Sequence, residues 1–401
     1  MASISEWYAG KNVLITGATG FMGKVLMEKL LRSCPDVKAL YILVRPKAGQ
    51  SMSERVQDMM MCKHFDVVCE IWTRARMKLN SYETQISIMG HYGWMDDSII
   101  CDITPRLIGD RPNTYTYTKA LAECVVQQES GKLNIAIIRP SIVGASWQEP
   151  FPAGKGILRT MRASNDAVAD LIPVDVVINL TLAAGWYTAV HRPKTALVYN
   201  CTTGGINPFH WGEIEHHVMS TFKRNPLEQA FRRPNANITS NYLINQYWIL
   251  VSHKFPALIY DLFLRLSGQK PQMMRIFNRL HKAIGLLAYF SSQDWEWNSD
   301  NMNMLMSQLS ADDRRTFNFD VRQLNWPEYI ENYCIGTKKY VLNEDMSDIP
   351  AARQHLRKLR NIRYTFNTVL LVFIWRVFIA RSQMARNIWY FVFAAFGGKG
   401  L

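Results

Sequence analysis

Residues 11–26 of the chain read Lys-Asn-Val-Leu-Ile-Thr-Gly-Ala-Thr-Gly-Phe-Met-Gly-Lys-Val-Leu. The apolar run before the glycines is typical of a buried strand, and the apolar residues after them have helical spacing. A second apolar run follows at Ala39 to Val44. A strand, a glycine turn, a helix and a second strand within about forty residues predict a βαβ unit.

The glycine turn has the spacing of a dinucleotide-binding turn. Gly17 permits the tight turn, Gly20 lets the backbone approach a pyrophosphate, and Gly23 lets helix and strand pack closely. The N-terminus of the helix then presents N–H groups and the positive end of its dipole to the phosphates. The residues that we expect to hold the cofactor in this turn are Thr16, Gly17, Thr19, Gly20, Phe21 and Gly23.

Two cations follow the second predicted strand. Arg45 and Lys47 stand where an acidic residue would bind the ribose hydroxyls of NAD. Cations at this place favour the additional phosphate of NADP, so the sequence predicts NADPH as the cofactor and both residues as its ligands. The alternative is that they are two exposed basic residues after a strand.

A tyrosine and a lysine lie four residues apart in Tyr115-Thr-Tyr-Thr-Lys119, so a helix would place both on one face. A phenol holds its proton at neutral pH, and a neighbouring ammonium favours the phenolate. Tyr115 and Lys119 are therefore the predicted catalytic pair, passing a proton to a carbonyl oxygen while a nicotinamide delivers hydride. Tyr117 is expected to be a packing residue. The predicted strand that follows ends at Pro140, a further predicted cofactor contact.

Composition limits the other classes of site. The hydrophobic share is 48 % and the charged share 20 %, which suits a globular core. The seven cysteines form no CxxC pair, so neither a metal site nor a disulfide framework is expected. The net charge of +13 would suit nucleic acid or an anionic membrane. From Ile349 onward there are nine Lys and Arg and no acid, beside an apolar run, which favours the membrane and argues against nucleic acid.

The apolar run from Tyr364 to Ala380 has seventeen residues. As a helix it spans about 25 Å, short of a hydrocarbon core of about 30 Å, so the helix must extend or Arg376 must snorkel. We expect a spanning or deeply inserted anchor, with the basic cluster from Arg353 to Arg363 on the cytosolic side. The alternative is an amphipathic helix on a surface.

Three segments are predicted. Residues 1–205 form an α/β domain with a Rossmann-like parallel sheet, residues 206–345 a mainly helical domain, and residues 346–401 the basic cluster and membrane tail. Within the first, residues 69–93 have no clean period of two or 3.6, and no buried strand is predicted between Val44 and Tyr115. The parallel sheet is therefore expected to be incomplete.

These features together resemble the extended short-chain dehydrogenase/reductase superfamily, and closely the fatty acyl-CoA reductase family. The resemblance covers residues 1–68 and 94–401, and its most specific segments are 15–26, 41–47, 115–119, 138–144, 232–235, 317–320, 325–326 and 328–332. A sugar-nucleotide epimerase would suit the first domain but neither the helical domain nor the tail.

The resemblance implies reduction of a saturated or unsaturated long-chain acyl-CoA by NADPH to a primary fatty alcohol, with release of CoA, as a supply for ether lipids and wax esters. It implies a peroxisomal, tail-anchored protein whose catalytic body faces the cytosol, and it matches Tyr115 and Lys119 to the catalytic pair. Association with further copies or with other reductase chains is a related expectation.

The chain departs from the family in its first domain. Three strands and a carbonyl-polarising serine are expected between the second strand and the tyrosine, and neither Ser98 nor Ser141 matches that serine's motif. Strands without their neighbours would leave polar groups unpaired at about 1–3 kcal/mol each. The second hypothesis is therefore a catalytically impaired, membrane-tethered relative that binds acyl-CoA or a full-length reductase without turnover.

Overall fold

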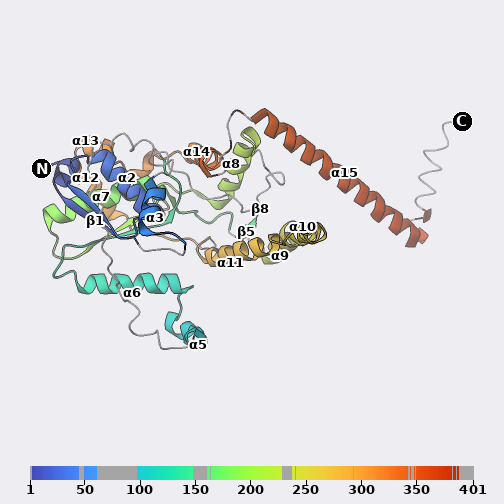
Figure 1. The fold of residues 1–401 in the computed structure, drawn as a ribbon, viewed down its shortest axis with the longest axis horizontal. Helices are drawn as coiled ribbons and strands as arrows, with labels where there is room; N and C mark the ends of the chain where they lie inside the picture. The colour runs from blue at the N-terminus through green and yellow to red at the C-terminus, as the bar shows by residue number, and fades with distance from the viewer. Residues whose placement is uncertain are drawn as a thin grey trace. The chain divides into compact units, whose positions relative to one another are not determined.

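The computed structural model describes residues 2–44, 49–60, 97–147, 160–162, 164–227, 237–239, 241–291, 293–341, 344, 347, 349–381, 383–384 and 386–387 (Figure 1). They form two compact units. The first comprises Met1–Val218 with Ala236–Leu342, and the second comprises Met219–Asn235 with Asn343–Leu401.

The first unit opens with the predicted βαβ arrangement. A short helix, α1 (Ile4–Tyr8), begins with a capping box between Ser3 and Glu6. Strand β1 (Asn12–Ile15) leads through the glycine turn into α2 (Phe21–Ser33), and β2 (Ala39–Ile42) pairs parallel with β1. The expected strand, turn, helix and strand are thus confirmed.

The other described strands also pair in parallel, two at a time. They are β3 (Ala136–Pro140) with β7 (Leu197–Cys201), β4 (Ile142–Val143) with β6 (Leu171–Ile172), and β5 (Thr160–Arg162) with β8 (Asn237–Thr239). Within the described ranges no strand joins the β1–β2 pair to the β3–β7 pair. The prediction of an α/β, Rossmann-like arrangement of parallel strands is confirmed. Residues 69–93, where strands were expected to be missing, lie outside the described residues, so the completeness of the sheet stays a prediction.

One face of β1 is exposed. Parallel strands normally bury both faces, yet Leu14 in the middle of β1 is 70 % exposed. Ile15, the next residue, is buried. The strand therefore packs on one side and leaves the other uncovered.

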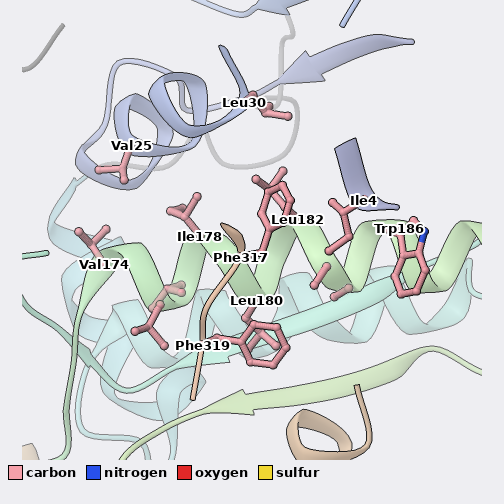
Figure 2. Packing of buried hydrophobic residues seen from close by; sticks show 14 of the residues in the cluster. Ile4, Val25, Leu30, Val174, Ile178, Leu180, Leu182, Trp186, Phe317 and Phe319 are labelled. Atoms are coloured by element: carbon pink, nitrogen blue, oxygen red, sulfur yellow. The ribbon is translucent and has the colours of Figure 1, made fainter. Parts of the chain in front are cut away.

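The core of the first unit is built around α7 (Val174–His191). This helix is apolar on all sides and most of its residues are buried, as expected of a central helix. Figure 2 shows Val25 and Leu30 of α2 beside Ile178 and Leu182 of α7. Because α7 contacts both α2 and β3, it links the two strand pairs, which no described strand connects.

The remaining described elements are helical, which confirms the mainly helical character predicted for the second half. In the first half they are α3 (Met52–Met60), α5 (Asp97–Ile108) and α6 (Thr114–Gln128). The second half contains α8 (Trp211–Arg224), α9 (Tyr242–Ile249), the π-helical turn η2 (Leu250–Lys254), α10 (Phe255–Leu266), α11 (Met273–Ser291), α12 (Asp300–Gln308), α13 (Ala311–Thr316), η3 (Val321–Gln323), α14 (Trp326–Gly336) and η4 (Thr337–Val341).

The second unit contains α15 (Ile349–Arg381), whose 33 residues give a length of about 50 Å at the rise of an α-helix. It is long and apolar enough to cross a membrane by length and composition, and none of its apolar window is buried. The predicted run of seventeen residues is therefore part of a longer helix that also carries the basic cluster.

Candidate functional site

The glycine turn adopts a conformation that only glycine accommodates without strain at its first position. Gly17 has φ +71° and lies two residues after the end of β1 at Ile15. Its carbonyl oxygen accepts a hydrogen bond of 2.9 Å from the N–H of Gly20, which closes the turn. L-amino acids other than glycine disfavour this left-handed region, so any residue with a Cβ in place of Gly17 would be strained.

The third glycine lies against the turn itself. A Cβ on Gly23 would come within 2.7 Å of the Cα of Ala18 and would meet the Gly17 carbonyl. Ala18 is fully buried, so neither backbone segment can give way cheaply. Gly23 is therefore required by the packing of α2 on the turn, as the sequence predicted.

The N-terminus of α2 suits an anion. Gly20 is its cap residue and offers no side chain to bond the first-turn N–H groups, and no acid stands in that turn. Thr16, Gly17 and Gly20 are exposed, while Thr19 is half-buried. Phe21, the first helical residue, is 41 % exposed. The N–H groups of a first helical turn, at the positive end of the helix dipole, are suited to bind an anion such as phosphate.

The predicted cations of the cofactor site, Arg45 and Lys47, lie outside the described residues. The described chain reaches Val44, and the Leu43 N–H donates to the Ile15 carbonyl at 3.2 Å, so β2 ends alongside the start of the glycine turn.

Tyr115 and Lys119 lie on one face of α6. The helix begins at Thr114 because Asn113 caps it, its Oδ1 accepting the Thr116 N–H at 2.9 Å. The Lys119 ammonium lies 5.8 Å from the centroid of the Tyr115 ring. Tyr115 is 65 % exposed.

A bidentate ion pair joins α6 to β3. Arg139 Nε donates to the two Glu123 carboxylate oxygens at 3.0 and 3.1 Å. Pro140, the last residue of β3, follows directly and pairs in register with Cys201 of β7. No residue described in α6 is buried, and this ion pair is a side-chain contact that attaches the helix to β3.

The predicted site residues therefore fall into two groups in the described structure. One is the glycine turn with the α2 N-terminus, and the other is the Tyr115–Lys119 pair beside β3. Across the described ranges no hydrogen bond, ion pair or ring contact links the two groups. The same ranges contain no cluster of His, Cys, Asp or Glu that could hold a metal.

Sequence reasoning missed two buried acids that organise loops. Asp170 Oδ1 accepts the N–H groups of Thr203 and Gly204 at 2.9 and 3.2 Å, just beyond the carboxyl end of β7. Asp175 Oδ1 accepts the Trp147 N–H at 2.9 Å and fixes the loop after β4. In open parallel sheets ligands bind beyond these strand ends. The available signal was the presence of two acids in an otherwise apolar run from Ala169 to Val177.

Ser141 is a further residue of interest, because its hydroxyl is buried and has no hydrogen-bond partner among the described residues. It follows Pro140 directly, and its N–H donates to the Cys201 carbonyl at 3.1 Å. A buried, unpaired hydroxyl at a strand end is a donor available to a ligand.

Two family models match the chain, and both are described as male sterility protein. The nucleotide-binding model matches residues 15–90 and 75–181, and the other model matches residues 252–344. The nucleotide-binding model therefore matches in two separate segments, whose ends overlap at residues 75–90.

Relatives match over nearly the whole chain. Fatty acyl-CoA reductase 1 of Xenopus laevis is 57 % identical and that of Gallus gallus 55 %, and fatty acyl-CoA reductase 2 of Bos taurus is 47 % identical. Each comparison covers 98 % of this chain and 96 % of the relative. Among solved structures, the terminal R domain from the myxalamid PKS-NRPS biosynthetic pathway covers 82 % of this chain and 90 % of that one, at 15 % identity and a TM-score of 0.42.

The lengths of these comparisons reveal a shortening. They run over 496 positions, whereas 98 % of 401 residues is about 393 residues. The relatives therefore have about a hundred positions, 496 less 393, with no counterpart in this chain.

Proposed function

The chain belongs to the fatty acyl-CoA reductase family, and from this premise we propose that it reduces a long-chain acyl-CoA to the primary fatty alcohol with NADPH. The observation that carries the proposal is an identity of 47–57 % over nearly the full length of relatives that bear this name. A nicotinamide cofactor is consistent with the nucleotide-binding family model over the glycine turn.

The cofactor would lie on the glycine turn. The N-terminus of α2 would hold its pyrophosphate through backbone N–H groups, with Gly17 and Gly20 allowing the approach. Arg45 and Lys47 would bind the phosphate that distinguishes NADPH from NADH. When bound, the nicotinamide supplies the hydride.

Tyr115 and Lys119 would handle the proton. The exposed Tyr115 hydroxyl would donate to the oxygen of the substrate carbonyl as hydride reaches its carbon, and Lys119, on the same face, would stabilise the phenolate that results. With a thioester, the first reduction gives a hemithioacetal, whose collapse to the aldehyde expels CoA. The aldehyde then accepts a second hydride and proton to give the alcohol.

The interrupted sheet supports a second candidate function. The chain lacks about a hundred positions of its relatives, and α6 carries the catalytic pair without a buried face in the described structure. A catalytically impaired relative that binds acyl-CoA or a full-length reductase would follow from a site whose two halves are not held together.

We further propose that α15 anchors the protein in the peroxisomal membrane with the body in the cytosol. The length of the apolar helix and the cations before its apolar stretch support an anchor of this orientation. Pairing with other copies or with related reductases belongs to the same proposal.

The test is turnover by purified full-length protein in detergent. NADPH consumption and fatty alcohol are measured in one tube with a saturated long-chain acyl-CoA. Alcohol formation at the expense of NADPH supports the reductase. Folded protein, judged by circular dichroism, that binds acyl-CoA but consumes no NADPH supports the impaired relative.

A further inference from the structure

The first unit carries a long apolar face that nothing in the described structure covers. Helices α9 and α10 are continuous through the π-helical turn η2, since Ile249, Lys254 and Phe255 all have helical backbone angles. Eight large apolar side chains along this helix are between 55 and 80 % exposed, among them Leu243, Tyr247, Phe255, Leu258, Leu262 and Leu266.

These residues form one stripe. Most of them recur at intervals of three or four residues, which places neighbours on one helix face. Tyr247 and Phe255 are eight apart, and the π turn between them takes up the additional residue, so the stripe continues across the join. The opposite side packs inward, because Asn245 and Ile249 are buried.

The stripe is held in a fixed hairpin with α11. Asp261 of α10 accepts the N–H groups of Met274, Met273 and Gln272 at 2.9, 2.9 and 3.0 Å, and so caps the start of α11. Gly268, with φ +74°, makes the turn between the helices. The exposed face therefore belongs to an ordered element with satisfied ends.

The exposed charges described in the hairpin are all positive. Residues 241–291 contain a single acid, Asp261, which is buried and engaged with backbone N–H groups. Five cations of the segment are exposed and flank the stripe and the turn: Lys254, Arg265, Lys270, Arg275 and Arg279. A helix with an apolar face and basic flanks is typical of a segment that lies in a membrane interface.

We propose that the hairpin of α9, η2, α10 and α11 lies in the headgroup layer of an anionic lipid membrane, with the stripe from Leu243 to Leu266 in contact with acyl chains. A second copy of the chain is a poorer partner for this face. Two such faces in contact would bring the five exposed cations of one copy close to the five of the other, and like charges repel. The chain also carries α15, a helix of membrane-spanning length whose apolar window has no buried residue, so a lipid surface is within reach of the protein. The hairpin adds a contact distinct from that anchor, and it does not depend on turnover.

The test uses the full chain in phosphatidylcholine vesicles with and without phosphatidylserine. Leu258→Cys and Leu262→Cys carry an environment-sensitive fluorophore, and Gln308→Cys, exposed on α12, is the matched control. The parent chain, labelled in parallel, gives the background from native cysteines such as the exposed Cys124. Quenching is compared between lipids that carry a doxyl group near the headgroup and lipids that carry it deep in the acyl chain.

The proposal predicts a blue shift of the emission from labels at 258 and 262 when the vesicles contain phosphatidylserine. It also predicts that doxyl lipids in these vesicles quench that emission. The shallow doxyl group should quench more than the deep one, and the label at 308 should show neither effect, since interfacial helices lie about 5–10 Å into the headgroup boundary. Labels at 258 and 262 that stay open to aqueous iodide overturn the proposal. Labels shielded from iodide but unquenched by lipid, in a protein that is dimeric by mass photometry, overturn it in favour of a second copy. Equal quenching in neutral vesicles contradicts the anionic preference.

Discussion

Glu123 of α6 and Arg139 of β3 form a bidentate ion pair, with the Arg139 Nε 3.0 and 3.1 Å from the two carboxylate oxygens. Their sequence separation is sixteen residues, so the contact closes the loop between the helix that carries Tyr115 and the strand that ends at Pro140. Because no residue described in α6 is buried, this pair positions the proposed catalytic face.

Glu123→Gln should loosen α6. Both side chains are partly exposed, so the expected loss of stability is small, about 0.2–1 kcal/mol. The local effect should be larger: faster amide hydrogen exchange from Thr114 to Gln128, with exchange in α2 unchanged. Glu129→Gln removes the far more exposed pair with Lys132 and is the control. Equal exchange in both variants would show that the Glu123 contact does not hold the helix.

Gly23→Ala should destabilise the first unit and weaken cofactor binding. Its Cβ would lie 2.7 Å from the Cα of Ala18, and overpacking of this kind costs roughly 1–3 kcal/mol. Gly131→Ala is matched, since a Cβ there meets nothing within 4 Å. Thermal unfolding and NADPH fluorescence titration measure the two effects. If Gly23→Ala bound NADPH with the affinity of the parent chain, the glycine turn would not be part of the cofactor site.

Charge reversal at Arg45 and Lys47 should weaken NADPH binding and leave NADH binding unchanged. Hydrogen bonds to charged groups are worth about 1.5–3 kcal/mol, so the dissociation constant should rise roughly ten-fold to a hundred-fold. Lys38→Glu, exposed at the opposite end of β2, is the control. A parallel loss for both cofactors would mean that the two cations do not read the phosphate.

Lys29 should give the first unit a measurable pH dependence. Burial, followed by Arg32, lowers the pKa of Lys29 to about 8, and its ammonium donates to the Thr316 carbonyl at 2.8 Å. The unfolded chain keeps the ordinary, higher pKa, so between pH 8 and about 10 it binds more protons than the folded chain. The contribution of Lys29 to the free energy of unfolding therefore rises with pH across this window.

Lys29→Met isolates that contribution. Burial raises the pKa of Cys34 to about 12, which has the opposite effect above pH 9, and the neighbouring Lys29 counteracts that rise. Both chains therefore carry Cys34→Ala. Denaturant unfolding at pH 8 and 9.5 should show the parent gaining stability relative to Lys29→Met. If the free energy of unfolding changed equally with pH in the two chains, the pKa of Lys29 would not be lowered in the folded protein.

Local signals in the sequence predicted much of this structure. The glycine turn was predictable because Gly17, Gly20 and Gly23 act within twelve residues of β1 through backbone sterics alone. The spacing of Tyr115 and Lys119 predicted a helix, and its start at Thr114 is set by the side-chain cap from Asn113. Similarly, the tail helix begins at Ile349 rather than Tyr364, since its basic first turns are also helical.

Contacts between distant residues were not predictable. Asp170 and Asp175 act on Thr203 and Trp147, about thirty residues away along the chain, and no periodicity encodes such pairs. The missing strand pattern before Tyr115 agrees with the separate strand pairs found among the described residues. The link between two of these pairs through a central α7 depends on packing that only the structure reveals.

The central claim, that the chain transfers hydride from NADPH to an acyl thioester with Tyr115 as proton donor, is tested most directly by isotope transfer. The full chain is given NADPH deuterated at the transferable position and a saturated long-chain acyl-CoA, beside Tyr115→Phe and Tyr117→Phe, and the alcohol is analysed by mass spectrometry. The account predicts two deuterium atoms at C1 for the parent and Tyr117→Phe, and no labelled alcohol from Tyr115→Phe that still binds NADPH. Unlabelled alcohol, or labelled alcohol from Tyr115→Phe at the parent's rate, would contradict it.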